Sequence, residues 1–308
     1  MGIIVNVFLY SLPYVLSLVV GIVVAEVWNK RKSPFHPEKK HLIPRKETDD
    51  EHDLQQGKLE ACDPGGDDKG DEDDDDSAFN LHEGEHIPFR MKYNFTEKEM
   101  VERSERFYKE MNDRRSVRFF SDKPVPLKVI ENIVKTAGTS PSGAHTEPWT
   151  FSVVRNQAVK MKVREIIEEE EKINYDKRMG DKWLNDLKHI GTTYKKPYLS
   201  KCSTLIIIFK QVHSFNEDGE KKTHYYHEIS TSISVGLMLA AIQNAGLVTC
   251  TTTPMNAGPR LRKLLGRQPY EKVLLLLPVG YAADNATVPD LHRKPLEKIM
   301  DLHDQIEE

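Results

Sequence analysis

The stretch Arg114-Arg115-Ser116-Val117-Arg118 (RRSVR) places three guanidinium groups and a hydroxyl within five residues. It follows a segment with helical spacing and leads into an extended one. Guanidinium groups are always charged and hold their donors in a fixed geometry, which suits phosphate oxygens and the polar edge of a planar ring. A basic run alone is more often a solvated surface patch, so the interpretation depends on the rest of the chain.

Three further motifs follow the arginine-rich stretch. PSGAHTEPW at residues 141–149 is a turn-rich loop whose small residues let backbone N–H groups approach a ligand, although a plain structural turn explains it too. VTCTTTPMN at residues 248–256 is a strand pattern ending in a row of hydroxyls, which β-propensity also explains. VGY at residues 279–281 precedes Arg293, a cation that could return to a phosphate. Each motif alone is a weak signal.

The segments between the motifs alternate between helical and strand patterns. Thr96 and Glu99 form a capping box ahead of apolar residues at helical spacing. Further helices are predicted at residues 126–138, 160–179 and 228–245. Short apolar runs bounded by breakers predict strands at residues 149–154, 205–209, 247–251 and 273–279. The pattern indicates one α+β domain, residues 88–308, with helices covering the faces of a sheet.

The front of the chain predicts a membrane anchor over residues 1–28, because residues 3–25 are almost wholly apolar and about 20 helical residues cross a bilayer. Basic residues at 30–32 follow the apolar run, which places the rest of the chain in the cytoplasm, at the plasma membrane or a vesicle membrane. A cleaved signal peptide is the alternative, but it would carry its basic residues before the apolar run.

Residues 29–87 predict a disordered linker that ends in an acidic run at 71–76. The run lacks the ligand spacing of a calcium loop. The chain has 44 basic and 48 acidic residues, a balance that argues against nucleic acid as a partner. Its three cysteines lie far apart without a CxxC pair, which argues against a disulfide framework and a structural metal.

Taken together, in this order and at these separations, the four motifs resemble the nitroreductase superfamily of FMN enzymes and, more closely, its iodotyrosine deiodinase branch. The resemblance covers residues 88–302. It implies a nitroreductase-like α+β fold with a mixed sheet flanked by helices, FMN as the cofactor, and an obligate homodimer with flavin sites at the subunit interface. An apolar anchor and a charged linker also precede the domain in that branch.

The resemblance implies which residues hold the flavin. The FMN-binding residues come from all four motifs: Arg114, Arg115, Ser116, Val117, Arg118, Ser142, Thr251, Thr252, Thr253 and Arg293. The arginines and Ser116 would hold the phosphate and the pyrimidine edge of the ring. Thr253 is the catalytic candidate, since its hydroxyl would hydrogen-bond flavin N5.

Substrate binding is implied for four further residues. A site that selects a free amino acid needs an acid and a base a few Å apart, preferably desolvated. By the resemblance, Glu171 would take the ammonium, Lys196 the carboxylate, and Tyr175 would reach both through its hydroxyl, while the Ala144 N–H would meet the phenolate oxygen. A solvated charged helix is the alternative for the run around Glu171.

The activity implied is reductive deiodination of mono- and diiodotyrosine to tyrosine and iodide, with NADPH as the ultimate donor through a separate reductase. No G-x-G-x-x-G follows a strand and no Walker sequence is present, so no dinucleotide site is visible. The alternatives are a broad NAD(P)H-dependent nitro or quinone reductase and a membrane scaffold that has lost its cofactor. His145 and Glu147 replace an Asn and a Gln of broader nitroreductases, and their roles stay open.

Overall fold

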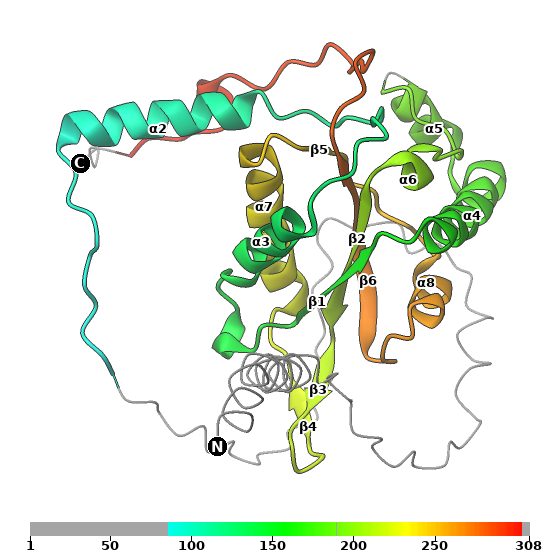
Figure 1. Ribbon diagram of the computed structural model, residues 1–308, viewed down its shortest axis with the longest axis horizontal. Helices are drawn as coiled ribbons and strands as arrows, with labels where there is room; N and C mark the ends of the chain where they lie inside the picture. The colour runs from blue at the N-terminus through cyan, green and yellow to red at the C-terminus, as the bar shows by residue number, and fades with distance from the viewer. Residues whose placement is uncertain (1–85, 189, 304–308) are drawn as a thin grey trace, which may run out of the picture. The chain divides into compact units, whose positions relative to one another are not determined.

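A four-stranded sheet forms the centre of the domain in the computed structural model, which describes residues 86–188 and 190–303 (Figure 1). Its strands lie in the order β1-β2-β6-β5. Their bounds are β1 (Trp149–Val154), β2 (Thr204–Gln211), β5 (Val248–Thr249) and β6 (Glu271–Gly280). The predicted anchor and the linker up to residue 85 lie outside this part of the chain, and none of the helices described is long and apolar enough to cross a membrane.

The sheet is antiparallel, so the prediction of a mixed sheet was wrong. β1 pairs with β2, β2 with β6 and β5 with β6, each time antiparallel. The helical excursion between β1 and β2 leaves and re-enters the sheet at one end, because Val154 pairs with Leu205. No crossover is then needed. A single isolated bridge, from Ser116 to Thr249, is parallel in the described part of the chain.

Helices cover both faces of the sheet. Their bounds are α2 (Glu97–Asn112), α3 (Leu127–Gly138), α4 (Gln157–Ile173), α5 (Asp181–Lys188), α6 (Tyr198–Lys201), α7 (His227–Asn244) and α8 (Gly258–Leu264). Short elements complete the domain: the helical turns η2 (Gly143–His145), η3 (Asn174–Arg178) and η4 (Leu296–Lys298), and the hairpin of β3 (His213–Phe215) and β4 (Lys221–Thr223). Figure 1 shows α3 and α7 on one face and α4, α6 and α8 on the other.

The core consists of two layers, one on each face of the sheet. Leu205, Ile207 and Phe209 of β2 pack in the cluster that α4, α6 and α8 close. Ile206 and Ile208 point to the opposite cluster, closed by α3 and α7. Successive side chains of a strand point to opposite faces, and both faces are covered here, which is why β2 is a continuous apolar run in the sequence.

Most of the predicted elements are confirmed, with shifted ends. The capping box of Thr96 and Glu99 opens α2. The strand predicted at 247–251 is only two residues long, and the helix predicted at 160–179 ends at Ile173 and continues as the π-helical turn η3. α2 buries none of its residues, and Met100 and Phe107 are 58% and 56% exposed. Only the end of α2 is covered in the described part of the chain, where Gln243 of α7 donates to the Glu110 carbonyl and Met111 is half-buried.

Replacing Glu271 with Gln should lower the free energy of unfolding by about 2 kcal/mol, because it would leave Arg267 without its buried carboxylate. Glu271 is 1% exposed and receives hydrogen bonds from Arg267 at 2.6 and 2.9 Å, from the Thr150 hydroxyl at 2.6 Å and from the Gln268 N–H at 2.9 Å. Burial raises the pKa of Glu271, but these bonds together hold the pKa below its ordinary value.

Because its pKa is lowered in the folded state, Glu271 should stabilise the protein more at neutral than at acid pH. A carboxylate whose pKa is lower in the folded state stabilises the protein above its unfolded-state pKa of about 4.3, and this contribution is lost as the pH falls through the folded-state value. Urea unfolding at neutral and at acid pH should therefore show the deficit of Glu271→Gln shrinking as the pH falls. A deficit that is the same at both pH values would contradict the assignment.

Candidate active site

The arginine-rich stretch lies at one end of the sheet, as an extended strand beside β5. The Val117 N–H donates to the Thr249 carbonyl at 3.0 Å, next to the parallel bridge of Ser116 and Thr249. Val117 is buried, whereas Ser116 and Arg118 line a cavity. The alternation of an extended chain therefore anchors the stretch through Val117 and turns its polar side chains toward the cavity.

Three guanidinium groups gather beside this stretch. Arg293 donates to the carbonyls of Asn112 and Arg114, each at 2.8 Å, and Arg115 donates to the Pro289 carbonyl. Burial lowers the pKa of Arg114, and the charges of Arg293 and Arg115 lower it further. No carboxylate within residues 86–303 forms an ion pair with any of the three. Asp113 and Asp290 line a hollow with Arg115 and Arg293 without pairing with them. The three guanidinium groups outnumber these two carboxylates, and the remaining positive charge favours a bound phosphate.

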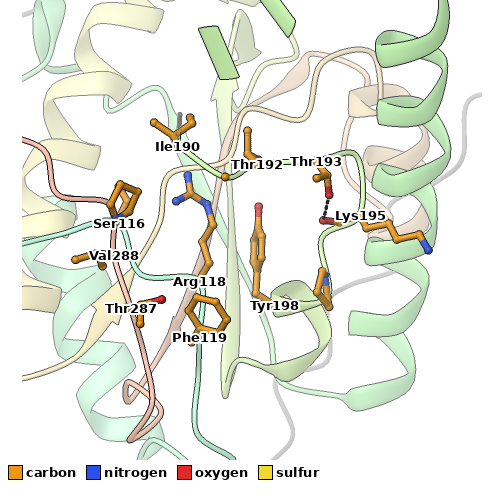
Figure 2. Close-up of a pocket in the computed structure, with 13 residues that line it drawn as sticks. Ser116, Arg118, Phe119, Ile190, Thr192, Thr193, Lys195, Tyr198, Thr287 and Val288 are labelled. Atoms are coloured by element: carbon orange, nitrogen blue, oxygen red, sulfur yellow. Dashed lines mark hydrogen bonds between the residues drawn. The ribbon is translucent and has the colours of Figure 1, made fainter. Parts of the chain in front are cut away.

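The cavity next to the cluster has a volume of about 600 Å³, within the usual range of cofactor sites. Figure 2 shows Arg118 extending toward the segment that carries Ile190 and Thr192, beside Tyr198. Within the described residues Arg118 has no hydrogen-bond or ion-pair partner. A phosphate at the arginine cluster and a planar ring beside Arg118 fit this arrangement, so the residues present suit FMN.

The predicted row of threonines is a turn beyond β5. Thr252 is buried, and its hydroxyl lies 3.4 Å from that of Tyr198. Its N–H donates to the Leu276 carbonyl at 3.0 Å, which fixes the turn against β6. Thr251 and Thr253 are exposed. Thr252 therefore serves the packing of the turn, while its two neighbours are free to meet a ligand.

Glu171 and Lys196, 25 positions apart in the sequence, form a buried ion pair with 3.5 Å between Lys196 Nζ and Glu171 Oε2. Their side chains are 10% and 7% exposed. Burial lowers the pKa of Lys196, and the Glu171 carboxylate partly opposes that effect. The interpretation of this run as a solvated helix is wrong for Glu171. Lys195 and Pro197, on either side of Lys196, line the same cavity as Arg118.

Tyr175 joins this pair. Its ring centroid lies 5.9 Å from Lys196 Nζ, and the ring of Tyr194 meets it edge-on. The Tyr175 hydroxyl is buried without a well-formed hydrogen bond. Burial and the Glu171 carboxylate raise the pKa of Tyr175, while the side chain of Thr192 opposes the shift. The structure thus brings together the three residues that were predicted to recognise an amino acid.

Two further residues, which were given no role from the sequence, hold this pair in place. Asn174 is 1% exposed, and its amide donates to Glu171 at 3.4 Å and accepts from Asn256 at 3.2 Å. Glu168 accepts from the Lys196 N–H at 2.7 Å. Neither belongs to a recognisable motif. Asn174 opens the π-helical turn η3, which no spacing rule predicts, and Glu168 lies in α4, one turn before Glu171.

Ser142 and Ala144 do not lie with the other predicted residues. Ser116 and Thr249 mark one end of the sheet, whereas Trp149, which follows the loop, pairs with Lys210 at the other end. About six residues of strand, roughly 20 Å, separate the two ends. The Ser142 hydroxyl accepts from the Glu147 N–H at 2.9 Å, so Ser142 shapes its own loop.

The loop backbone is left-handed at three residues that are not glycine: Ala144 (φ 48°), His145 (φ 52°) and Glu147 (φ 45°). Such conformations are costly and concentrate at ligand sites. Within the described residues, the Ala144 N–H donates to no acceptor. His145 and Glu147 are exposed, and the structure gives their side chains no further role.

The fold and this site define a nitroreductase-type protein: the model of the nitroreductase family matches residues 111–281. Two relatives are more specific. The chain is 62% identical over 216 residues to iodotyrosine deiodinase 1 of Homo sapiens, covering 70% of this chain and 74% of that protein. It is 62% identical over 206 residues to iodotyrosine deiodinase of Hydra vulgaris, covering 67% and 76%.

A solved structure agrees with the relatives. The crystal structure of oxidized iodotyrosine deiodinase bound to FMN and 3-iodo-L-tyrosine superposes with a TM-score of 0.54 at 25% identity, covering 65% of this chain and 100% of that one. A BluB-like flavoprotein from Clostridium difficile, at 21% identity and a TM-score of 0.50, shares the fold. The chain belongs to the nitroreductase family, in its iodotyrosine deiodinase branch.

Proposed function

We infer that the protein is an FMN-dependent iodotyrosine deiodinase that reduces mono- and diiodotyrosine to tyrosine and iodide. The observation that carries this inference is the buried pair of Glu171 and Lys196 beside the cavity that Arg118 lines. The cavity suits a phosphorylated flavin, and the pair suits the ammonium and carboxylate of an amino acid. A nitro or quinone reductase would have no use for such a pair.

The protein side chains bind and orient the substrate. The substrate ammonium would replace Lys196 as the partner of Glu171, and the substrate carboxylate would take Lys196, so both buried charges stay compensated. FMN, when bound, would supply the two electrons that, with one proton, replace the carbon–iodine bond by a carbon–hydrogen bond and release iodide. Thr253, exposed at the turn beyond β5, is the proposed hydroxyl donor to the flavin.

The test is an anaerobic titration of the reduced, FMN-loaded full-length protein with diiodotyrosine, following flavin absorbance and free iodide together. We expect the flavin to reoxidise in step with iodide release. A flavin that stays reduced with diiodotyrosine but reoxidises with nitroaromatics or quinones would leave the fold assignment intact and reject the substrate.

We also propose a homodimer that completes each site. α7 is anchored at its start by the loop, through a 3.3 Å hydrogen bond from the Gly143 N–H to Ser230, and at its end it leads into β5 beside the arginine-rich stretch. Its 18 residues span about 27 Å. A two-fold axis across α7 would bring the Ser142 and Ala144 loop of one protomer to the arginine-rich stretch of the other.

The surface of α7 supports that arrangement. Ile229, Ile233 and Leu237 are 59%, 45% and 36% exposed and recur every four residues along one side. Gly236 lies beside them with open space around it, so a second helix could approach closely. The opposite side of α7 packs in the core of its own domain, so α7 is apolar on both sides. Such a helix is normally buried on all sides, which favours a partner on the exposed one.

Replacing Ile233 with Glu should therefore yield a monomer in sedimentation measurements, and FMN affinity should fall at least tenfold, since each site would lose the loop of the other protomer. Val153→Glu, a similar change at an exposed apolar residue of β1, should leave both unchanged. A variant that is monomeric yet binds FMN as tightly as the wild type would show that the sites are complete within one chain.

For the electron source we propose NADPH acting through a separate reductase. The described residues show no dinucleotide fold of their own. Anaerobic mixing with NADPH alone should leave the flavin oxidised for minutes, whereas rapid reduction would favour a broad NAD(P)H-dependent reductase.

We further propose that residues 1–28 anchor the protein in a membrane with the catalytic domain in the cytoplasm, on the basis of the apolar run and the basic residues that follow it. Asn94 and Asn285 both lie in glycosylation sequons. A cytoplasmic domain would leave both unmodified, so glycan found at either one by mass spectrometry would reverse the orientation.

A further inference from the structure

A second cavity, of about 680 Å³, lies between α4 and the end of α6 and shares no lining residue with the cavity of Arg118. In Figure 1 these two helices lie side by side. A single carboxylate, that of Asp122, lines it. Its cationic lining side chains are Arg155, Lys160, Arg164 and Lys201. Arg164 is paired with Glu168, just outside this lining. Three unpaired positive charges therefore face one carboxylate, in a hollow with no role in the proposed reaction.

Two of the unpaired positive charges are held by neutral groups. Lys160 is 5% exposed, and its ammonium donates to the carbonyl of Cys202 at 2.6 Å. The Arg155 guanidinium donates to the Val125 carbonyl at 2.9 Å. Within the described residues neither cation, nor Lys201, forms an ion pair. Carbonyls orient a cation without cancelling its charge, so the buried ammonium still favours an anion nearby.

The walls of this cavity are ordered by their own hydrogen bonds. Gln157 donates to the Ser200 carbonyl at 3.1 Å, and Arg164 donates to the Ser200 hydroxyl at 3.1 Å. The cavity opens on the first turn of the 17-residue helix α4, whose dipole adds to the positive potential. We propose that this cavity binds a phosphate or diphosphate group, separately from the flavin phosphate.

The cavity is linked to the proposed substrate pair. Arg164 Nε donates to Glu168 Oε1 at 2.7 Å, and the Lys196 N–H donates to the same oxygen at 2.7 Å. An anion bound to Arg164 competes with Glu168 for the guanidinium and loosens the hold of Glu168 on Lys196. Occupancy of the cavity therefore weakens iodotyrosine binding. This second step rests on the proposed function, whereas anion binding does not.

Binding is tested by calorimetric titration of pyrophosphate into the FMN-saturated full-length protein at constant ionic strength. The double variant Arg155→Gln/Lys201→Gln should bind roughly a hundredfold more weakly, about tenfold for each charge-assisted contact. Lys162→Gln removes a charge from an exposed position of α4 outside the cavity and should bind as the wild type does. No heat of binding to the wild type, or equal binding by the double variant, would overturn the proposal.

A parallel titration with ADP identifies the source of the group. Tighter binding than pyrophosphate points to a nucleotide, equal binding points to the free anion, and both support the site.

The link to the substrate is measured through the affinity for iodotyrosine, followed by flavin absorbance with and without saturating pyrophosphate. We expect affinity to fall about fivefold, and the double variant to be insensitive. An unchanged affinity would reject the link while the calorimetry stands. Absence of iodotyrosine binding even without pyrophosphate would instead reject the proposed function.

Discussion

Lys196→Gln should lower kcat/KM for diiodotyrosine by roughly a hundredfold to a thousandfold, and Glu171→Gln by a similar factor, because each leaves one buried charge of the substrate or the protein without a partner. The two side chains are almost completely buried and 3.5 Å apart. Removing one partner of a buried pair costs about 3–5 kcal/mol, far more than removing one partner of a surface pair, because the other charge stays buried without a partner. The double variant should lose less than the product of the two single losses, since the residues act as one unit.

The controls separate recognition from folding and from chemistry. Lys172→Gln alters the exposed neighbour of Glu171 and should keep wild-type activity. An iodinated phenol without the amino acid group cannot use the pair, so all variants should turn it over at the wild-type rate. Equal losses with both substrates would mean that the substitutions damage the flavin site, and the assignment of Glu171 and Lys196 to the zwitterion would then be wrong.

Local sequence patterns predicted the parts of the fold that depend on local physics. The capping box at Thr96 opens a helix, and the apolar run of β2 becomes the buried central strand. The direction of strand pairing could not be predicted in the same way, since it depends on where the excursion from β1 re-enters the sheet. The exposure of the apolar residues of α2 could not be predicted either, because no local pattern indicates that the described chain leaves most of them uncovered.

The residues of the candidate site also differ in whether local sequence or the fold reveals them. The arginines were found because their chemistry is concentrated in five consecutive residues. Glu171 and Lys196 came from a family resemblance, since residues 25 apart meet only through the fold of α4, η3 and α5. Asn174 and Glu168 were given no role, because their contacts with Glu171 and with the Lys196 N–H form only in the fold. Ser142 and Ala144 were assigned to the same site, yet one chain keeps them at the other end of the sheet.

Arg114→Gln should weaken FMN binding by about tenfold to a hundredfold and leave riboflavin binding almost unchanged. Arg114 belongs to the arginine cluster with Arg115 and Arg293, where a phosphate would bind, and riboflavin lacks the phosphate. A hydrogen bond to a charged group contributes about 1.5–3 kcal/mol, which corresponds to that range of affinities. Fluorescence quenching of each ligand on titration with apoprotein measures both constants.

Arg118 should behave differently, and the contrast makes the test decisive. Arg118 lines the cavity itself, where its charge acts on Lys196 and Tyr198, so its partner should be the ring rather than the phosphate. Arg118→Gln should therefore weaken FMN and riboflavin by the same factor, again about tenfold or more. Arg106→Gln, at an exposed position of α2, should change neither. The opposite result, in which Arg118→Gln discriminates between the two ligands and Arg114→Gln does not, would mean that the flavin lies in the cavity in the reverse orientation. Its ring would then lie away from Lys196. Direct contact between the ring and an amino acid held by Glu171 and Lys196 would no longer be possible.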